Sequence, residues 1–214
     1  MNFEKPFVIG IAGSSCSGKS FIADRLKEIL NETVAGVISL DSYYHDLKDL
    51  PFAEREQKNF DRPEAVNFDL LKRDLNRLLR GEIVRIPVYD FSTHTRKPET
   101  EWTEICTGEK KANRQVLILE GLYAFRDREL RELIDFRIFV ETDYNLCLSR
   151  RIERDVRERG RSERSVRETF ENNVLPMYER FVLPTRDHSD LVIDGADEYN
   201  LNLRKIMNEL DSLF

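Results

Sequence analysis

The chain has 214 residues, of which 40% are hydrophobic and 35% are charged, and its formal net charge at pH 7 is −6. This length and apolar fraction predict a single domain over residues 1–214 with a sizeable core. The acidic balance argues against a general binder of nucleic acids or membrane surfaces, because such a binder needs excess cationic charge.

The cysteines and the apolar runs exclude further classes. Cys16, Cys106 and Cys147 are scattered and form no CxxC pair, so neither a zinc site nor a disulfide framework is indicated. No charged-then-apolar leader opens the chain, and its first apolar run is far too short to span a bilayer. We therefore expect a cytoplasmic protein with neither a nucleic-acid partner nor a membrane association.

Segments typical of strands alternate with segments typical of helices. The expected strands lie at residues 7–12, 37–40, 116–119, 136–140 and 191–193. The expected helices lie at 19–30, at 68–79 after an Asn67 N-cap, on a core stripe of Leu148, Ile152 and Val156, at 163–178 and at 201–213. This alternation predicts an α/β fold with a parallel sheet covered by helices on both faces. Ligands bind beyond the carboxyl ends of the strands in such sheets.

Residues 83–107 differ in composition from the segments around them. They combine β-branched and aromatic residues with Pro87 and a polar centre, which predicts a β-hairpin insertion laid over the main sheet. The preceding stretch, residues 46–62, is polar and is expected to be irregular.

The stretch GSSCSGKS matches the full G-x-x-x-x-G-K-[ST] pattern of a phosphate-binding loop. Its residues are Gly13, Ser14, Ser15, Cys16, Ser17, Gly18, Lys19 and Ser20. The glycines let backbone N–H groups approach a phosphate, and the following helix directs its positive end at the anion. Lys19 is expected to bridge the β- and γ-phosphates and Ser20 to ligate magnesium. The pattern predicts binding of ATP or GTP with Mg²⁺.

Two carboxylates follow predicted strands directly. Asp41 ends the second strand and Glu120 ends the strand at 116–119, so both should emerge beside the phosphate-binding loop. Asp41 is the candidate general base for an alcohol acceptor, and the candidate metal set is Ser20, Glu120 and Asp41. The D-x-x-G and N-K-x-D strings of a GTPase switch are both missing from the sequence, which favours transfer to a small molecule.

Residues 150–165 form an arginine-rich segment that is locally basic in an acidic chain. Arg150, Arg154, Arg157 and Arg161 are expected to recur on one side of a helix, opposite the core stripe. Such a helix, ending at a glycine, predicts a lid that closes on the triphosphate, neutralises the transferred group and excludes water.

Several strings resemble the uridine kinase (uridine–cytidine kinase) family of P-loop kinases, from about Phe7 to Ile193. They are DSYY at 41–44, NFDRP at 59–63, PVYDFSTHTR at 87–96, LEG at 119–121, SRRIERD at 149–155, ERGR at 158–161 and PTR at 184–186. The resemblance implies phosphorylation of the 5′-hydroxyl of uridine and cytidine by ATP or GTP in pyrimidine salvage. It also implies a homo-oligomer.

The resemblance assigns roles by position. Asp41 corresponds to the catalytic base, with Lys19, Arg154 and Arg159 acting near the phosphates. Asp61 and Arg151 correspond to binders of the sugar hydroxyls. The pyrimidine pocket corresponds to Tyr44, Tyr89, His94 and Arg161. The chain departs from the family at Thr169, where a glutamine is common, and at Ile193-Asp194-Gly195, where a Pro-Arg-Gly string is common.

Two other functions remain open on the sequence alone. One is a phosphoribulokinase-like enzyme with another small alcohol acceptor. A site for a sugar phosphate would need cationic side chains, however, where this chain has Tyr44, Tyr89 and His94. The other is a nucleotide-binding regulator without catalysis, against which Asp41 and Glu120 argue.

Overall fold

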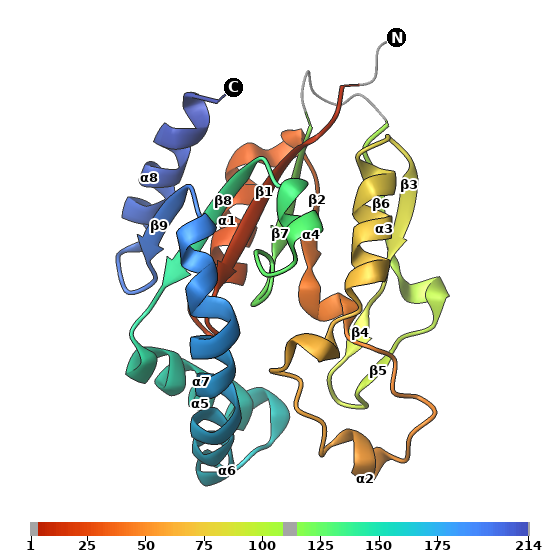
Figure 1. Ribbon diagram of the computed structural model, residues 1–214, viewed down its shortest axis with the longest axis vertical. Coiled ribbons are helices and arrows are strands. Elements are labelled where there is room, and N and C mark those ends of the chain that lie inside the picture. The colour runs from red at the N-terminus through yellow and green to blue at the C-terminus, as the bar shows by residue number, and fades with distance from the viewer. Residues whose placement is uncertain (1–3, 109–114, 214) are drawn as a thin grey trace.

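The computed structural model describes residues 4–108 and 115–213 (Figure 1). At its centre is a sheet of five parallel strands in the order β2-β7-β1-β8-β9. The strands are β1 (Phe7–Gly13), β2 (Val34–Ser39), β7 (Val116–Glu120), β8 (Phe136–Glu141) and β9 (Leu191–Asp194). The expected parallel α/β sheet is therefore confirmed, with each strand within a few residues of its predicted position.

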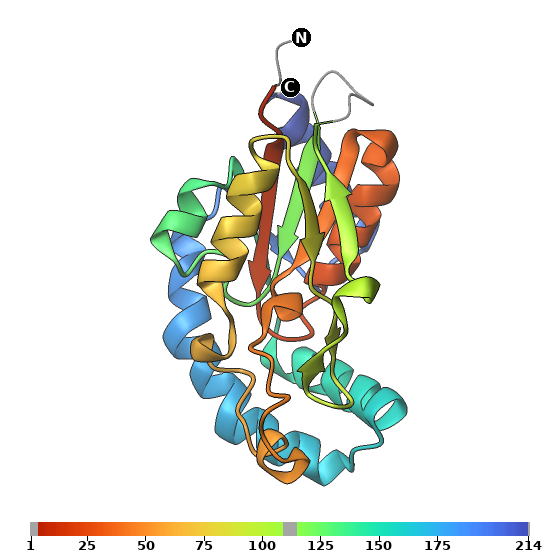
Figure 2. The same ribbon diagram turned by 90° about the vertical axis from the view of Figure 1, so that its right-hand side faces the viewer.

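Helices cover both faces of the sheet because its strands are apolar on both sides. Every residue of β1 and β7 is buried, as expected of central parallel strands. One face packs against α1 (Lys19–Leu30) and α8 (Tyr199–Asp211), and the other against α3 (Phe68–Leu78) and α4 (Arg128–Glu132). Figure 2 shows α3 and α4 on one side of the strands and α1 on the other.

The insertion consists of two short antiparallel pairs rather than one continuous hairpin. Strand β3 (Ile83–Ile86) pairs with β6 (Thr103–Cys106), and β4 (Tyr89–Asp90) pairs with β5 (Thr95–Arg96). Ile105 packs so closely on β2 that a Cβ at Gly36 would lie 2.5 Å from its Cδ1 atom. The insertion is thus anchored beside the edge strand β2. The stretch expected to be irregular contains a short helix, α2 (Phe52–Arg55).

The arginine-rich segment begins with α5 (Tyr144–Arg159), which ends at Gly160 with a left-handed φ of 63°. A helical arm follows and returns to the sheet, so it is longer than predicted. It comprises α6 (Glu163–Thr169), a π-helical turn (Phe170–Val174), α7 (Leu175–Met177), a second π-helical turn (Tyr178–Val182) and a 3₁₀-helix (Leu183–His188).

The predicted core stripe of α5 is wrong at its last member. Leu148 is buried with Phe170 and Val174, but Val156 is 44% exposed. The reason is visible in Figure 1, where α5 and α6 extend beyond the end of the sheet. The far end of α5 therefore has no sheet core to pack against.

Candidate active site

The phosphate-binding loop joins β1 to α1. Gly13 and Gly18 have φ angles of 149° and 107°, in the region that favours glycine. A Cβ at Gly13 would lie 2.3 Å from the carbonyl oxygen of Val140, whereas one at Gly18 would meet no atom within 4 Å. The loop is therefore tightly packed where it leaves β1 and open where it enters α1, which leaves room for an anion at the helix N-terminus.

The remaining loop residues supply polar groups to the same place. Ser14, Ser15 and Ser17 are buried, and Cys16 has a left-handed φ of 60°. Lys19 folds back and donates through Nζ to the carbonyl oxygen of Ser14 at 2.6 Å. The buried Ser17 hydroxyl has no hydrogen-bond partner among the described residues. The open space at Gly18, the N-terminus of α1 and the Lys19 ammonium together fit a phosphate-bearing ligand.

Asp41 and Glu120 lie beside this loop, as predicted, because β2 and β7 are neighbours with Ser39 opposite Glu120. Asp41 is in the 3₁₀-helix that follows β2 (Leu40–Tyr43). Burial raises the pKa of Asp41, and the charge of Lys19 opposes that rise. Burial also raises the pKa of Glu120, again opposed by Lys19 and reinforced by Asp41. The two carboxylates and Lys19 thus share one electrostatic environment.

The predicted magnesium residues form a small oxygen donor set. The Ser20 hydroxyl donates to Glu120 Oε2 at 3.3 Å, and Asp41 is near enough to act on the pKa of Glu120. Within residues 4–108 and 115–213, no three His, Cys, Asp or Glu side chains gather as a metal-binding group. Mg²⁺ commonly uses one or two carboxylates and takes its other ligands from water and phosphates, so these residues fit that ion.

Asp61 and Arg151 meet across the site. Arg151 on α5 is buried and contacts both carboxylate oxygens of Asp61, at 3.2 and 3.3 Å. Its Nη1 also donates to Ser15 Oγ at 3.0 Å. This one guanidinium therefore connects the loop that carries Asp61, α5 and the phosphate-binding loop.

Aromatic rings gather between Asp41 and the insertion. The rings of Tyr44 and Tyr89 are 5.4 Å apart, and Tyr44 also contacts Phe60 and Phe91 at 5.5 and 6.5 Å. Tyr89 is only 6% exposed, and its hydroxyl has no partner among the described residues. The two tyrosines are buried, Phe60 is half-buried and Phe91 is exposed, so the cluster presents flat apolar faces together with an unused hydrogen-bonding group.

His94 joins this cluster through its ring face. It stacks on Phe60 with ring centroids 4.8 Å apart and planes 14° apart, and on Phe52 at 6.2 Å. Burial lowers the pKa of His94, which keeps the imidazole neutral at pH 7. A neutral imidazole carries one donor and one acceptor nitrogen, so His94 can serve either a carbonyl or an amino group.

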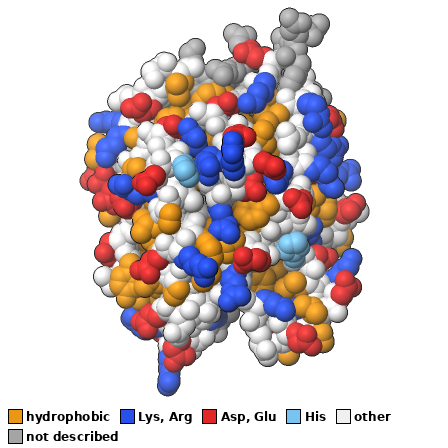
Figure 3. Space-filling model, in the orientation of Figure 1, with side chains coloured by type: hydrophobic (Ala, Val, Ile, Leu, Met, Phe, Trp, Pro, Cys, Tyr) orange, Lys and Arg blue, Asp and Glu red, His pale blue; other side chains and the backbone are white. Residues whose placement is uncertain are grey.

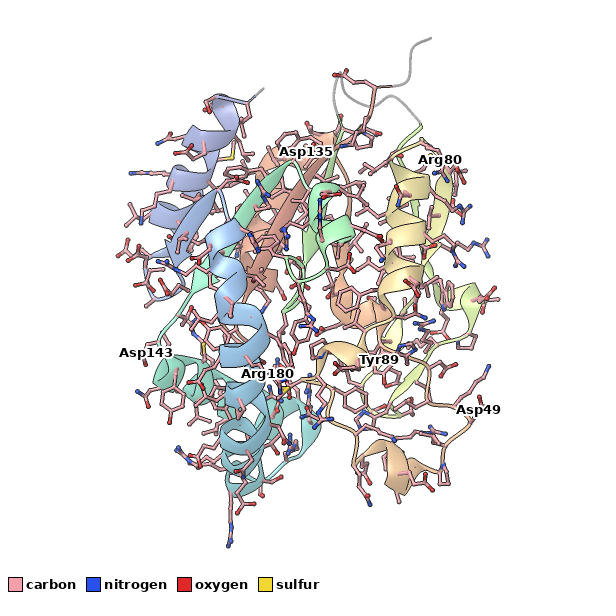
Figure 4. All side chains as sticks on the ribbon, in the orientation of Figure 1. Asp49, Arg80, Tyr89, Asp135, Asp143 and Arg180 are labelled. Carbon is pink, nitrogen blue, oxygen red and sulfur yellow. The ribbon has the colours of Figure 1, made fainter. Side chains whose placement is uncertain are left out.

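The two sides of the site belong to different parts of the chain. Figure 4 shows Tyr89 in the part that carries the insertion and Asp143, the N-cap of α5, on the opposite side. In Figure 3 the lower edge of the surface is notched between these two parts, with Lys and Arg side chains above the notch. Arg159 reaches the insertion directly, because its guanidinium carbon lies 5.2 Å above the ring of Phe91.

The predicted lid arginines do not all face the same way. Arg150 donates to the carbonyl oxygens of Ser17 and Gly195, at 3.4 and 3.0 Å, and so binds α5 to the phosphate-binding loop. Arg154 and Arg159 lie near Asp41. The charge of Arg154 opposes the rise that burial causes in the pKa of Asp41, and the charge of Asp41 opposes the fall that burial causes in the pKa of Arg159. Arg157, in contrast, is 66% exposed and paired with Glu153 and Glu158, so the prediction that it shares one side of the helix with Arg150 and Arg154 is wrong. It lies on the outer face of the part of α5 that leaves the core.

Arg161 lies just beyond α5 and is held by α6. Its Nη2 donates to Thr169 Oγ1 at 2.7 Å and to Ser165 Oγ at 3.0 Å. Thr169, the position where the sequence departs from its expected glutamine, therefore contacts an arginine of the predicted base pocket.

A cavity of about 530 Å³ adjoins the phosphate-binding loop between α1, the turn after β9 and α8. Phe21 and Tyr199 stand at it as an edge-to-face pair, 5.7 Å apart. Gly195 closes one side, since a Cβ there would lie 2.1 Å from Thr142 Oγ1 and 2.3 Å from the carbonyl oxygen of Ser17. The cavity is large enough for a nucleobase and its ribose.

Sequence reasoning did not single out Phe60, Phe91, Tyr199 or Asp155, which the structure places in or beside the site. Phe60 and Phe91 lie in strings that carry the family resemblance, and their place in those strings could have indicated that they belong to the site. Asp155 likewise ends the SRRIERD string at 149–155, whereas nothing in the spacing of Tyr199 pointed to a site.

A nucleotide-binding loop on a parallel sheet, two strand-end carboxylates and an arginine-rich helical arm together define a P-loop kinase. The Phosphoribulokinase / Uridine kinase family matches residues 8–201 of the chain. The chain is 43% identical to a uridine kinase of Salmonella paratyphi B over 97% of its own length and 95% of the relative's. It is 39% identical to a uridine kinase of Ligilactobacillus salivarius over 91% and 88% of the two chains.

The solved phosphoribulokinase of Rhodobacter spheroides shares the fold, with a TM-score of 0.60 and 18% identity over 90% of this chain and 73% of that one. The chain belongs to the Phosphoribulokinase / Uridine kinase family and is a kinase that uses a nucleoside triphosphate as donor. Among the described residues, no helix has both the length and the apolar character needed to cross a membrane.

Proposed function

We propose that this chain transfers the γ-phosphoryl group of ATP or GTP to the 5′-hydroxyl of uridine and cytidine, giving UMP and CMP. One observation carries the proposal. Asp41 lies within electrostatic reach of Lys19 on the donor side and of Asp61 and Tyr44 on the acceptor side. The charge that would activate an alcohol thus stands between the phosphate-binding loop and a ring-lined pocket, and the names of the relatives agree.

The acceptor side suits a nucleoside better than a sugar phosphate. Asp61 accepts hydrogen bonds and can bind ribose hydroxyls, while Tyr44, Tyr89 and Phe60 supply flat faces for a pyrimidine. Neutral His94 can hydrogen-bond the 4-oxo group of uridine or the 4-amino group of cytidine. These properties support acceptance of both nucleosides.

In the proposed reaction Asp41 orients the 5′-hydroxyl and receives its proton as the oxygen attacks the γ-phosphorus. Lys19, Arg154 and Arg159 neutralise charge on the transferred group. Ser20, Glu120 and Asp41 would hold Mg²⁺, which supplies further neutralisation of the phosphate oxygens when bound. The cavity beside Phe21 and Tyr199 would take the base and ribose of the donor.

One assay tests the proposal. ADP or GDP release is measured with each triphosphate, magnesium and a panel of uridine, cytidine, purine nucleosides and sugar phosphates. We expect turnover to be stimulated by uridine and cytidine and the product to carry phosphate on the 5′-oxygen. Stimulation by a sugar phosphate alone would assign the phosphoribulokinase-like reaction instead, and stimulation by none of these acceptors would refute a nucleoside kinase.

A further inference from the structure

Asp155 stands at the centre of the arginine-rich segment, and its side chain is completely buried. Four guanidinium groups surround its carboxylate. The nitrogen-to-oxygen distances are 3.5 Å to Arg151 Nε, 2.8 Å to Arg154 Nη2, 3.6 Å to Arg159 Nη1 and 3.7 Å to Arg161 Nη1. No part of this carboxylate is open to a substrate, so its effect must pass through the arginines.

The backbone of Asp155 holds the same region. Gly160 caps α5 by donating its N–H to the Asp155 carbonyl oxygen, and the N–H of Arg161 donates to that oxygen at 3.2 Å. The side chain and the carbonyl of one residue thus hold the end of α5 and the first residue after its glycine. Arg161 is thereby placed at the carboxylate although it lies beyond the helix.

Without Asp155 these cations would repel one another. Arg151 has a second carboxylate partner in Asp61, but Asp155 is the carboxylate that Arg154 and Arg159 share. The side chains of Arg154 and Arg159 keep 32% and 35% of their surface exposed, so neither arginine is enclosed as Asp155 is. A buried carboxylate acts strongly on charges at these distances, because little water screens it.

We propose that Asp155 is a positioning residue, whose carboxylate arranges Arg154, Arg159 and Arg161 in advance for the transferred phosphoryl group. This inference rests on the proposed phosphoryl transfer. Donors that are already in place need no reorganisation during the reaction, and that is where such groups contribute most to the rate. The alternative is a purely structural role, in which Asp155 stabilises the end of α5 and nothing else.

The first test replaces Asp155 by asparagine, which keeps the shape and removes the charge. We expect kcat with uridine to fall about 10- to 100-fold while the KM of the triphosphate changes less than about threefold. The matched control is Glu153→Gln on the same helix, whose side chain is 74% exposed and pairs with Arg157. It should leave kcat within about twofold of the wild type. A folded Asp155→Asn enzyme with the wild-type kcat would overturn the inference.

A double-mutant cycle separates positioning from structural support. If Asp155 acts in part through Arg159, the fall in kcat of the Asp155→Asn/Arg159→Gln enzyme should be smaller than the product of the two single falls. Asp155→Asn combined with Glu153→Gln should show independent effects. Multiplying effects in the first pair would show that Asp155 does not act through that arginine.

If Asp155→Asn does not fold, Asp155→Glu takes its place, because it keeps the charge and moves it by one methylene. We expect that variant to lower kcat at least about fivefold with little change in the triphosphate KM. A wild-type kcat would again contradict positioning. Failure of the proposed function appears separately, as a wild-type enzyme that no nucleoside stimulates, and the same variants are then assayed with whichever acceptor is active.

Discussion

The guanidinium of Arg151 contacts both carboxylate oxygens of Asp61 and at the same time donates to Ser15 of the phosphate-binding loop. A planar group with several fixed donors is needed for these contacts, and a lysine ammonium cannot replace it. One buried side chain therefore joins the phosphate-binding loop to the loop that we propose binds the acceptor.

Arg151→Lys should uncouple them. We expect the KM of uridine to rise about tenfold, because Asp61 would lose its two-point contact, and the melting temperature to fall because a buried carboxylate is left underpaired. Steady-state kinetics and thermal unfolding measure the two effects. Arg157→Lys, on the exposed face of the same helix, is the control. An unchanged uridine KM would remove the Asp61–Arg151 pair from acceptor binding.

Asp41→Asn should abolish most of the turnover and spare donor binding. We expect kcat to fall about 10²- to 10⁴-fold, because a general base is lost, while calorimetry should give a triphosphate Kd within about threefold of the wild type. The control is Asp49→Asn, which removes the same charge from an exposed position nearby in the chain and should leave kcat and the triphosphate Kd unchanged. Full activity of Asp41→Asn would exclude Asp41 as the base.

His94→Ala should weaken the nucleoside much more than the triphosphate. Loss of the imidazole removes a hydrogen-bonding group and exposes the face of Phe60 on which it stacks. We expect the KM of uridine to rise about tenfold and that of ATP to change less than about twofold. Exposed His45 gives a control, His45→Ala. Equal rises in both constants would indicate a folding defect rather than a role in the acceptor pocket.

The pH dependence should carry the signature of raised carboxyl pKa values. Burial raises the pKa of Asp41, and a base works only when ionised, so activity should be lost as pH falls through a value above that of an ordinary aspartate. The free energy of unfolding should change with pH in the opposite direction to the activity. A raised folded-state pKa favours the protonated form, so the contribution of Asp41 to stability increases as pH falls.

A kcat/KM profile and a series of melting temperatures at different pH values measure these two trends. Glu120 shares the direction of the shift, so Glu120→Gln identifies which acid limb belongs to Asp41. Since burial lowers the pKa of His94, no inflection should appear near the usual histidine value. An acid limb at the ordinary aspartate value would contradict the buried environment of Asp41.

The regular parts of the fold were predictable because their signals are local. Residues 116–119 are a continuous apolar run that ends at Glu120, and Asn67 accepts the capping hydrogen bond from Leu70 that its position suggested. The phosphate-binding loop and the carboxylates at strand ends followed from spacing alone. Val156 failed because helical periodicity shows which residues share a face but not whether anything covers that face.

Side-chain partners across the site could not be read from spacing. Arg157 and Arg159 lie only two positions apart in a run of charges, yet one points outward and the other reaches Phe91. Asp155 looks like one more acid in that run, although it is completely buried. Both outcomes depend on where α5 leaves the core, and that is a property of the tertiary structure.

The position of Gly195 has a mechanical consequence. Its carbonyl is bound by Arg150, and Thr142 donates to Ser17 at 3.0 Å, so three chain segments are locked together at the donor end. The phosphate-binding loop, the base of the helical arm and the turn after the last strand must then behave as one rigid frame. We therefore expect any opening for the proposed nucleoside at the far end, where Arg159 of α5 contacts Phe91 of the insertion. The enzyme would bind its donor at a rigid site and change its conformation around the acceptor.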